Sequence, residues 1–193
     1  MTDDTPFSRL ATLACHDLRT PLATVHGFAR TLEQSDLVEP AARYAAMIGQ
    51  ASRELAELID ELALAARIEG GRYDPVLRDS DSLALARAAA ERLGADRVVV
   101  GGKGEAVRVD PEPSVRSLAA LAQSALRHGG LEIVELIVEG RRLRLFPVTR
   151  AAAPVVLGEE LRDLGAGVAV RHLHALGASL ALEGETVVLE LPA

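Results

Sequence analysis

The strongest constraint on the fold is a run of apolar residues that recur at alternating steps of three and four positions. The run begins at Ala41 and continues without a break to Ala65. A repeat of 3.5 residues is typical of helices that pack along a coiled-coil seam. The sequence therefore predicts a long helix whose apolar stripe must be covered by another helix. The stripe consists of Ala41, Tyr44, Ile48, Ala51, Leu55, Leu58, Leu62 and Ala65.

A second apolar stripe at helical spacing precedes this one. Residues 35–40 are expected to form a turn and Gly70-Gly71 to end the second helix, so residues 1–71 are predicted to fold as an antiparallel helical hairpin. One hairpin buries little apolar surface, so we expect two copies to pair as a four-helix bundle, a symmetric homodimer. The alternative is that the hairpin packs on the C-terminal part of its own chain. The first stripe consists of Phe7, Leu10, Ala14, Leu18, Val25, Phe28 and Leu32, with Leu22 close to it.

Beyond the hairpin, residues 72–193 alternate short helical and strand patterns. Segregated helices and antiparallel strands predict a sheet covered by helices on one face. The fold class expected for the whole chain is α+β, a helical hairpin followed by a small α/β sandwich. Strands are expected at residues 76–77, 97–100, 106–109, 131–138, 143–148, 180–182 and 186–191, with helices ending near residue 94 and spanning 114–128 and 167–176.

Composition narrows the classes of function. The formal net charge is -7 at pH 7 and Lys and Arg form no dense block, so we expect no nucleic-acid partner. A single cysteine, Cys15, excludes an internal disulfide and a thiolate zinc cluster, and no metal site is expected. The amino terminus is acidic where a secretory signal is basic, and no apolar run approaches the roughly 20 residues that cross a bilayer. The sequence therefore predicts a cytoplasmic protein without a membrane segment.

The stretch CHDLRTPL, residues 15–22, lies within the first predicted helix. On a helix of about 100° per residue, His16 points away from the apolar stripe, so we expect its ring to be exposed. Asp17 can accept a hydrogen bond from one ring nitrogen and leave the other as a nucleophile. Pro21 cannot donate to the carbonyl of Asp17, and prolines usually bend helices, so we expect a structural hinge at Pro21.

This stretch resembles the H-box of two-component sensor histidine kinases, whose pattern is His-Glu/Asp-Leu-Arg-Thr-Pro-Leu. The resemblance implies that His16 is the phosphoacceptor, that Asp17 assists its phosphorylation, and that Thr20 orients water in dephosphorylating members. It also implies a dimer and response-regulator receiver domains as partners. We expect receivers to dock on the exposed face of the same helix, which carries Arg19, Ala23, His26, Gly27 and Arg30.

The C-terminal part resembles the kinase ATP-binding domain in its order of elements but not in its ligand-binding residues. Ser124 stands where the family's magnesium-binding Asn is expected, and Ala120 occupies the companion position. A serine hydroxyl is a poorer magnesium ligand than an amide carbonyl, and alanine offers no ligand. No Asp-x-Gly-x-Gly box follows residue 148, and Gly165 and Gly167 are a remnant of the last glycine box. The sequence therefore predicts a degenerate nucleotide site that holds neither ATP nor its own magnesium.

Together these features predict a histidine phosphotransferase that passes phosphoryl groups between His16 and receiver aspartates, without ATP. The receiver is expected to supply the Mg²⁺, so the protein needs no cofactor of its own. Two alternatives remain open at this point. One is a regulatory pseudokinase module that binds a partner without phosphorylation of His16, and the other is an active histidine kinase with a divergent ATP site.

Overall fold

The computed structural model describes residues 6–94 and 96–193 of the 193-residue chain, and the side chains of residues 6, 7, 9 and 10 lie outside that description. The chain divides into two compact units, Met1–Tyr73 and Asp74–Ala193. The sequence places the corresponding boundary between residues 71 and 72. Each unit is described by itself.

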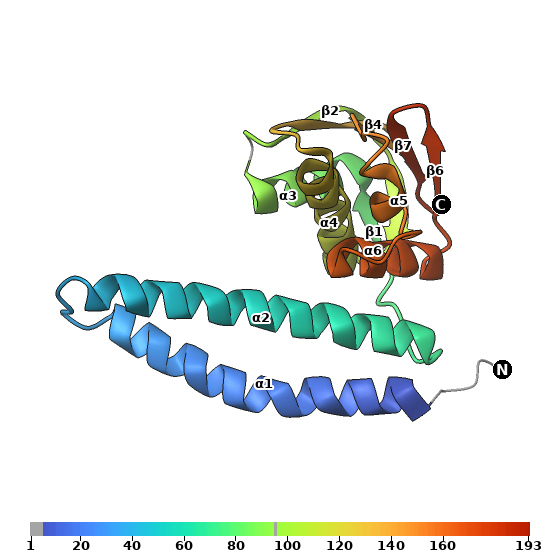
Figure 1. Cartoon of the computed structure of the whole chain (residues 1–193). Helices are drawn as coiled ribbons and strands as arrows, with labels where there is room; N and C mark the ends of the chain where they lie inside the picture. The colour runs from blue at the N-terminus through green and yellow to red at the C-terminus, as the bar shows by residue number, and fades with distance from the viewer. Residues whose placement is uncertain (1–5, 95) are drawn as a thin grey trace. The chain divides into compact units, whose positions relative to one another are not determined.

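The first unit is a helical hairpin, as the sequence predicts. Helix α1 spans Pro6–Glu33 and helix α2 spans Ala41–Glu69, and the two lie side by side over their length (Figure 1). Helix α2 ends where Gly70 donates its N–H to the Ala66 carbonyl and Gly71 takes a φ of 64°, a left-handed conformation that glycine adopts without strain.

Small side chains form the seam between α1 and α2. The buried positions include Cys15, Ala29, Ala45, Ser52 and Ala63, each no more than 3% exposed. Because the seam is built from small residues, the helices approach closely and the larger apolar side chains remain outside. Those exposed side chains include most of the predicted stripes: Leu18, Val25, Phe28, Leu32, Tyr44, Ile48, Leu55, Leu58 and Leu62, with exposed fractions between 38% and 68%.

The second unit contains a five-stranded sheet and four helices. The strands of the sheet follow the order β2-β4-β5-β7-β6, in which β2 and β4 are parallel and the other neighbours antiparallel, while β1 and β3 pair separately. Helices α3 to α6 cover one face of the sheet (Figure 1). The α+β prediction is therefore confirmed. The elements are β1 Arg78–Asp81, α3 Ser82–Leu93, β2 Val98–Gly104, β3 Ala106–Val109, α4 Pro111–Gly129, β4 Val134–Gly140, β5 Arg142–Phe146, α5 Ala153–Val156, α6 Leu164–Ala175, β6 Ser179–Glu183 and β7 Thr186–Glu190.

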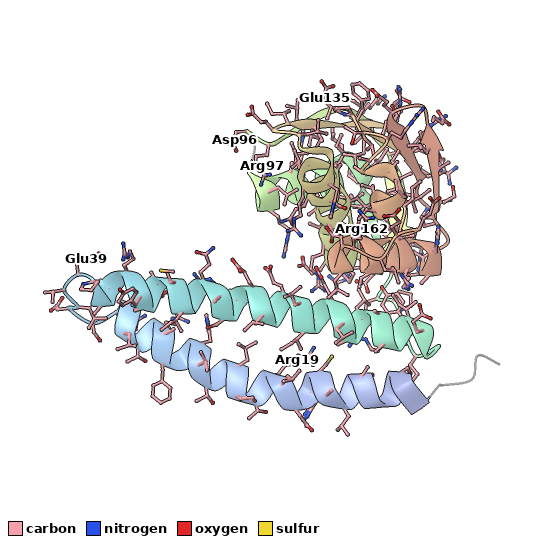
Figure 2. The ribbon with its side chains drawn as sticks, in the orientation of Figure 1. Arg19, Glu39, Asp96, Arg97, Glu135 and Arg162 are labelled. Carbon is pink, nitrogen blue, oxygen red and sulfur yellow. The ribbon has the colours of Figure 1, made fainter. Side chains whose placement is uncertain are left out.

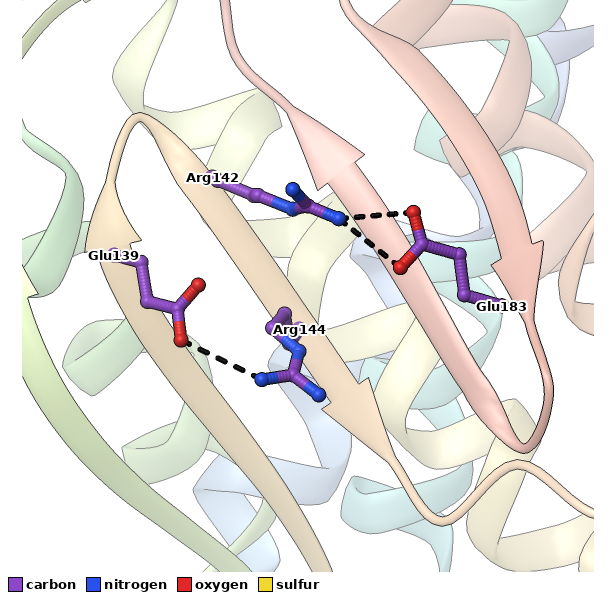
Figure 3. Close-up of polar contacts among 4 residues, drawn as sticks. All are labelled: Glu139, Arg142, Arg144 and Glu183. Atoms are coloured by element: carbon purple, nitrogen blue, oxygen red, sulfur yellow. Dashed lines mark hydrogen bonds and ion pairs between the residues drawn. The ribbon is translucent and has the colours of Figure 1, made fainter.

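The core of this unit lies between the helices and the sheet and is aliphatic, with Leu126, Leu143 and Leu173 no more than 1% exposed. The open face of the sheet carries charged side chains instead. There, Arg142 donates to Glu183 at 2.9 Å and Arg144 to Glu139 at 3.4 Å (Figure 3). Because these side chains are about half exposed, their ion pairs stabilise the unit by no more than about 1 kcal/mol each.

Several element boundaries differ from the sequence prediction for local reasons. The strand expected at residues 76–77 begins at Arg78, because the N–H of Val76 donates to the Asp110 side chain instead of a strand. The strand expected from residue 131 begins at Val134, because Gly130 is left-handed and the N–H of Leu131 closes the end of α4. Within the described residues, no helix is long and apolar enough to cross a membrane.

Candidate functional site

His16 lies on α1 with its ring in solvent. Its side chain is 78% exposed, and its Nδ1 lies 3.1 Å from Oδ1 of Asp17. A carboxylate can only accept, so in the neutral ring Nδ1 carries the proton and donates, while Nε2 keeps its lone pair. The arrangement leaves an outward nucleophilic nitrogen on a rigid helix, which suits transfer of a group from a second molecule.

Thr20 and Pro21 lie one turn further along α1, and both side chains are exposed. The carbonyl of Thr20 accepts a bond of 3.2 Å from the Thr24 hydroxyl. Helix α1 is helical through Pro21 and curves along its length (Figure 1). The roles of Thr20 in orienting water and of Pro21 as a hinge stay predictions.

The guanidinium of Arg19 is hydrogen-bonded to a carboxylate of the other helix. Its Nη2 and Nε donate to Oδ1 of Asp60 on α2 at 2.7 and 3.3 Å. Figure 2 shows the Arg19 side chain between the two helices. The two residues are 41 positions apart, so no local pattern in the sequence could have paired them. The sequence predicts Arg19 on a docking face; its guanidinium has a partner within the hairpin, and docking at Arg19 stays a prediction.

The remaining residues of the expected docking face differ in exposure. Ala23, Gly27 and Arg30 are exposed, and a Cβ at Gly27 would meet open space. His26 is half-buried, and its buried Nδ1 has no hydrogen-bond partner among the described residues. The face therefore offers small side chains and one cation to a partner, and receiver docking there stays a prediction.

The expected nucleotide site lies along α4 and α6, which pack against each other in the second unit. Ser124 is fully buried, and its Oγ has no hydrogen-bond partner in the described part of the chain. Ala120 is half-buried. Gly165 and Gly167 lie inside the first turns of α6, which begins at Leu164 and not at residue 167 as the sequence predicted. These glycines are therefore part of a helix and not of a loop around a ligand.

Asp163 occupies the N-terminus of α6. Its Oδ1 accepts from the N–H of Ala166 at 3.1 Å, and its Oδ2 lies 3.3 Å from Nε2 of His128 and 3.6 Å from Nη1 of Arg127. A helix N-terminus attracts anions because its first N–H groups are unpaired and its dipole is positive there. In this chain the protein's own carboxylate, only 10% exposed, accepts from one of these N–H groups, and the loss of nucleotide binding stays a prediction.

His172 joins α6 to the other end of α4. Its Nδ1 lies 2.9 Å from the Ser117 hydroxyl, and the ring is fully buried. Burial lowers the pKa of His172 to about 4, opposed by the charge of Asp110 and assisted by that of Arg116. The buried ring is thus neutral at neutral pH and joins the two helices through its bond to Ser117.

Two pockets of the second unit lie away from Ser124 and the α6 glycines. One, of about 830 Å³, is enclosed by α5, α6 and the β6–β7 hairpin. Another, of about 600 Å³, follows the ends of β2 and β4. Neither is lined by Ala120, Ser124, Gly165 or Gly167 within the part of the chain described. Among the described residues, no three His, Cys, Asp or Glu side chains are grouped so as to hold a metal ion.

Sequence reasoning missed the two contacts that define these sites, Arg19 with Asp60 and Asp163 with His128. The first pairs residues from separate helices and has no local signal. The second has a partial signal, because an Asp directly before a helix is a common N-cap. The sequence prediction began α6 at residue 167, which hid the cap.

The comparisons with known proteins agree with the hairpin and with the fold of the whole chain. Residues 8–71 match the His Kinase A (phospho-acceptor) domain. The structure of full-length ShkA in complex with AMPPNP is 21% identical with a TM-score of 0.68, covering 95% of this chain and 45% of that chain. The chain therefore spans less than half the length of that ShkA chain.

Two further structures are similar over nearly the whole chain. Acinetobacter baumannii histidine kinase AdeS is 17% identical with a TM-score of 0.55, covering 92% of this chain and 97% of that one. A structure described as a bacterial phosphotransferase is 15% identical with a TM-score of 0.45, covering 98% and 97%. No curated protein matches the sequence. Residues 8–71 therefore match the His Kinase A (phospho-acceptor) domain, and the chain as a whole shares its fold with the ShkA and AdeS structures.

Proposed function

We propose that this protein is a histidine phosphotransferase of the cytosol that moves phosphoryl groups between receiver domains through His16, without ATP. The observation that carries the proposal is the exposed His16 ring, whose Nδ1 is turned to Asp17 and whose Nε2 is left with a lone pair. The His Kinase A match over residues 8–71 supports the choice of His16 as the acceptor.

The transfer step needs few groups from this chain. The Nε2 lone pair attacks the phosphorus of a receiver's aspartyl phosphate, an N–P bond forms, and the P–O bond to the aspartate breaks, which leaves a carboxylate. Mg²⁺ bound by the receiver offsets the charge on the phosphoryl oxygens. The hydrogen bond from Nδ1 to Asp17 stabilises the positive charge that develops on the ring. Reversal of the same step on a second receiver completes the relay.

Two features of the second unit support a relay that does not use ATP. The buried Ser124 offers no accessible magnesium ligand, and the Asp163 carboxylate caps α6 and places a negative charge at its N-terminus. ShkA was solved with AMPPNP bound. An active kinase with a divergent site is therefore the alternative to be tested, together with a pseudokinase module that is never phosphorylated.

The exposed apolar side chains of the hairpin support a homodimer. Large residues of both helices, among them Phe28, Tyr44 and Leu55, are more than half exposed in the single chain. Many large apolar side chains exposed on one hairpin are costly in water and are commonly covered by a partner. A second hairpin of the same sequence would bury them as a four-helix bundle.

A labelling experiment separates the three readings. The purified chain is incubated with a panel of receivers charged by acetyl phosphate, and in parallel with labelled ATP and Mg²⁺. The phosphotransferase accepts label from at least one receiver and none from ATP. Label from ATP indicates an active kinase, and no label from either indicates a pseudokinase module.

Two variants assign the label to a residue. His16→Gln should abolish acceptance of label from receivers. His174→Gln, which changes an exposed histidine of α6, is the matched control and should accept label like the unchanged protein. Label that persists in His16→Gln would overturn the assignment of His16.

A further inference from the structure

We infer that Asp60 controls how much phosphoryl His16 holds at equilibrium, by competing with the phosphoryl group for the Arg19 guanidinium. This inference rests on the proposed function and adds a positioning residue to it. Arg19 lies three positions after His16 on α1, and Asp60 reaches it from α2. Arg19 and Asp60 therefore link α1 to α2 one turn from His16.

Geometry makes Arg19 available to a phosphoryl group on His16. Side chains three positions apart on a helix are neighbours, with Cβ atoms about 5–6 Å apart. The arginine side chain is long, and its guanidinium pairs strongly with phosphate oxygens. A phosphoryl group on the exposed Nε2 of His16 would thus stand within reach of Arg19 and carry close to two negative charges.

Asp60 holds the same cation in the unphosphorylated protein. Nη2 and Nε of Arg19 donate to one oxygen, Oδ1 of Asp60, at 2.7 and 3.3 Å. The two side chains are 46% and 47% exposed, so water screens the pair and the guanidinium can leave Asp60 at little cost. Asp60 and the phosphoryl group compete for the Arg19 guanidinium. A change that weakens the bond between Asp60 and Arg19 must therefore favour the phosphorylated form of His16.

The measurement is the equilibrium constant for exchange of phosphoryl between one receiver and His16. This constant refers to the free proteins, so a change in docking affinity alone does not alter it. We expect Asp60→Asn to shift the equilibrium toward phosphohistidine by about twofold to fivefold, the range typical of exposed ion pairs. Arg19→Gln should shift it the other way by a similar factor. Both shifts should shrink as salt is raised, because the charges are exposed.

The double variant Arg19→Gln/Asp60→Asn shows whether Asp60 acts through Arg19. In the Arg19→Gln background, Asp60→Asn should have little further effect. A shift that persists there would mean that Asp60 repels the phosphoryl group directly, and no shift in any variant would mean that the pair only joins the helices. Either result overturns the inference.

Matched controls separate this inference from the proposed function. Asp36→Asn and Arg43→Gln make the same charge changes at exposed positions near the far turn of the hairpin, and they should leave the equilibrium unchanged. Arg43 is 17 positions from Asp60 on α2, about 25 Å along the helix at 1.5 Å per residue. If the unchanged protein accepts no label, the proposed function fails. If it accepts label and all variants share its equilibrium, only the inference fails.

Discussion

His172 makes the stability of the second unit depend on pH in a way that can be calculated. The ring is fully buried, and its Nδ1 is bonded to the Ser117 hydroxyl. Burial lowers its pKa from 6.5 to about 4, because the charged ring would lose its hydration. The unfolded chain keeps the higher pKa and therefore binds a proton first as the pH falls. The stabilisation is fully present above pH 6.5 and is lost progressively between there and pH 4.

The size of the loss follows from the two pKa values. Between about pH 7.5 and pH 5, the extra proton bound by the unfolded state lowers the free energy of unfolding by about 2 kcal/mol. A domain of this size loses roughly 4 °C of Tm per kcal/mol, so the expected fall in Tm is about 8 °C.

The assay is differential scanning calorimetry of the full chain at the two pH values, with two variants. His172→Gln removes the titrating ring and should reduce the pH-dependent fall in Tm by about 8 °C. His174→Gln changes an exposed histidine two positions away on α6 and should keep the full pH dependence. If His172→Gln and the unchanged protein lose equal stability on acidification, the ring does not titrate as its burial requires and the reasoning is refuted.

Three further changes test other parts of the structure. Asp163→Ala removes the N-cap of α6 and its ion pairs, and should lower the free energy of unfolding, measured in urea, by about 2 kcal/mol. Asp163→Asn keeps the cap and should lower it by about half as much. Equal losses in the two variants would contradict the role of the charge. Gly102→Ala places a Cβ against a backbone carbonyl of β4 at a φ of 100° and should lower the free energy of unfolding by at least about 2 kcal/mol. In Gly101→Ala the Cβ meets only the tip of a flexible side chain, so the loss should be less than about 1 kcal/mol. Similar losses in the two variants would refute the clash. Leu58→Arg on the exposed stripe of α2 should convert the dimer to a monomer, as measured by analytical sedimentation. Val99 is equally exposed on the sheet, and Val99→Arg should leave the dimer intact. If the unchanged protein is itself a monomer, the four-helix bundle is contradicted.

The hairpin could be predicted from the sequence because its signal is local and repeated. Steps of three and four residues specify a helix, and Gly70-Gly71 marks its end. The choice of residues at the seam could not be predicted in the same way. The stripes of large apolar residues, which we expect a second hairpin to cover, are exposed in the single chain, and the small residues Cys15, Ala29 and Ala45 form the seam within it. Each helix carries a stripe of large apolar residues and a stripe of small ones, and either could face the other helix. A hydrophobic pattern favours the large residues, so it does not identify the small ones as the seam.

Prediction of the candidate sites was limited by contacts between distant residues. The exposure of His16 and its bond to Asp17 follow from neighbouring positions on one helix, and the sequence contains that information. The contact of Arg19 with Asp60 depends on the register of two helices, which no short pattern specifies. The boundary of α6 was predicted three residues late, because Gly165 and Gly167 oppose helix formation and only the cap at Asp163 offsets them.

The measurement that tests the central claim most directly is the location of the phosphoryl group after reaction with a charged receiver. The chain is incubated with a phosphorylated receiver and Mg²⁺, quenched in alkali to preserve phosphohistidine, digested and analysed by mass spectrometry. The account predicts phosphate on the peptide that contains His16, and its loss when an unphosphorylated receiver is added. Phosphate on another residue, or on His16 only when ATP replaces the receiver, would contradict it.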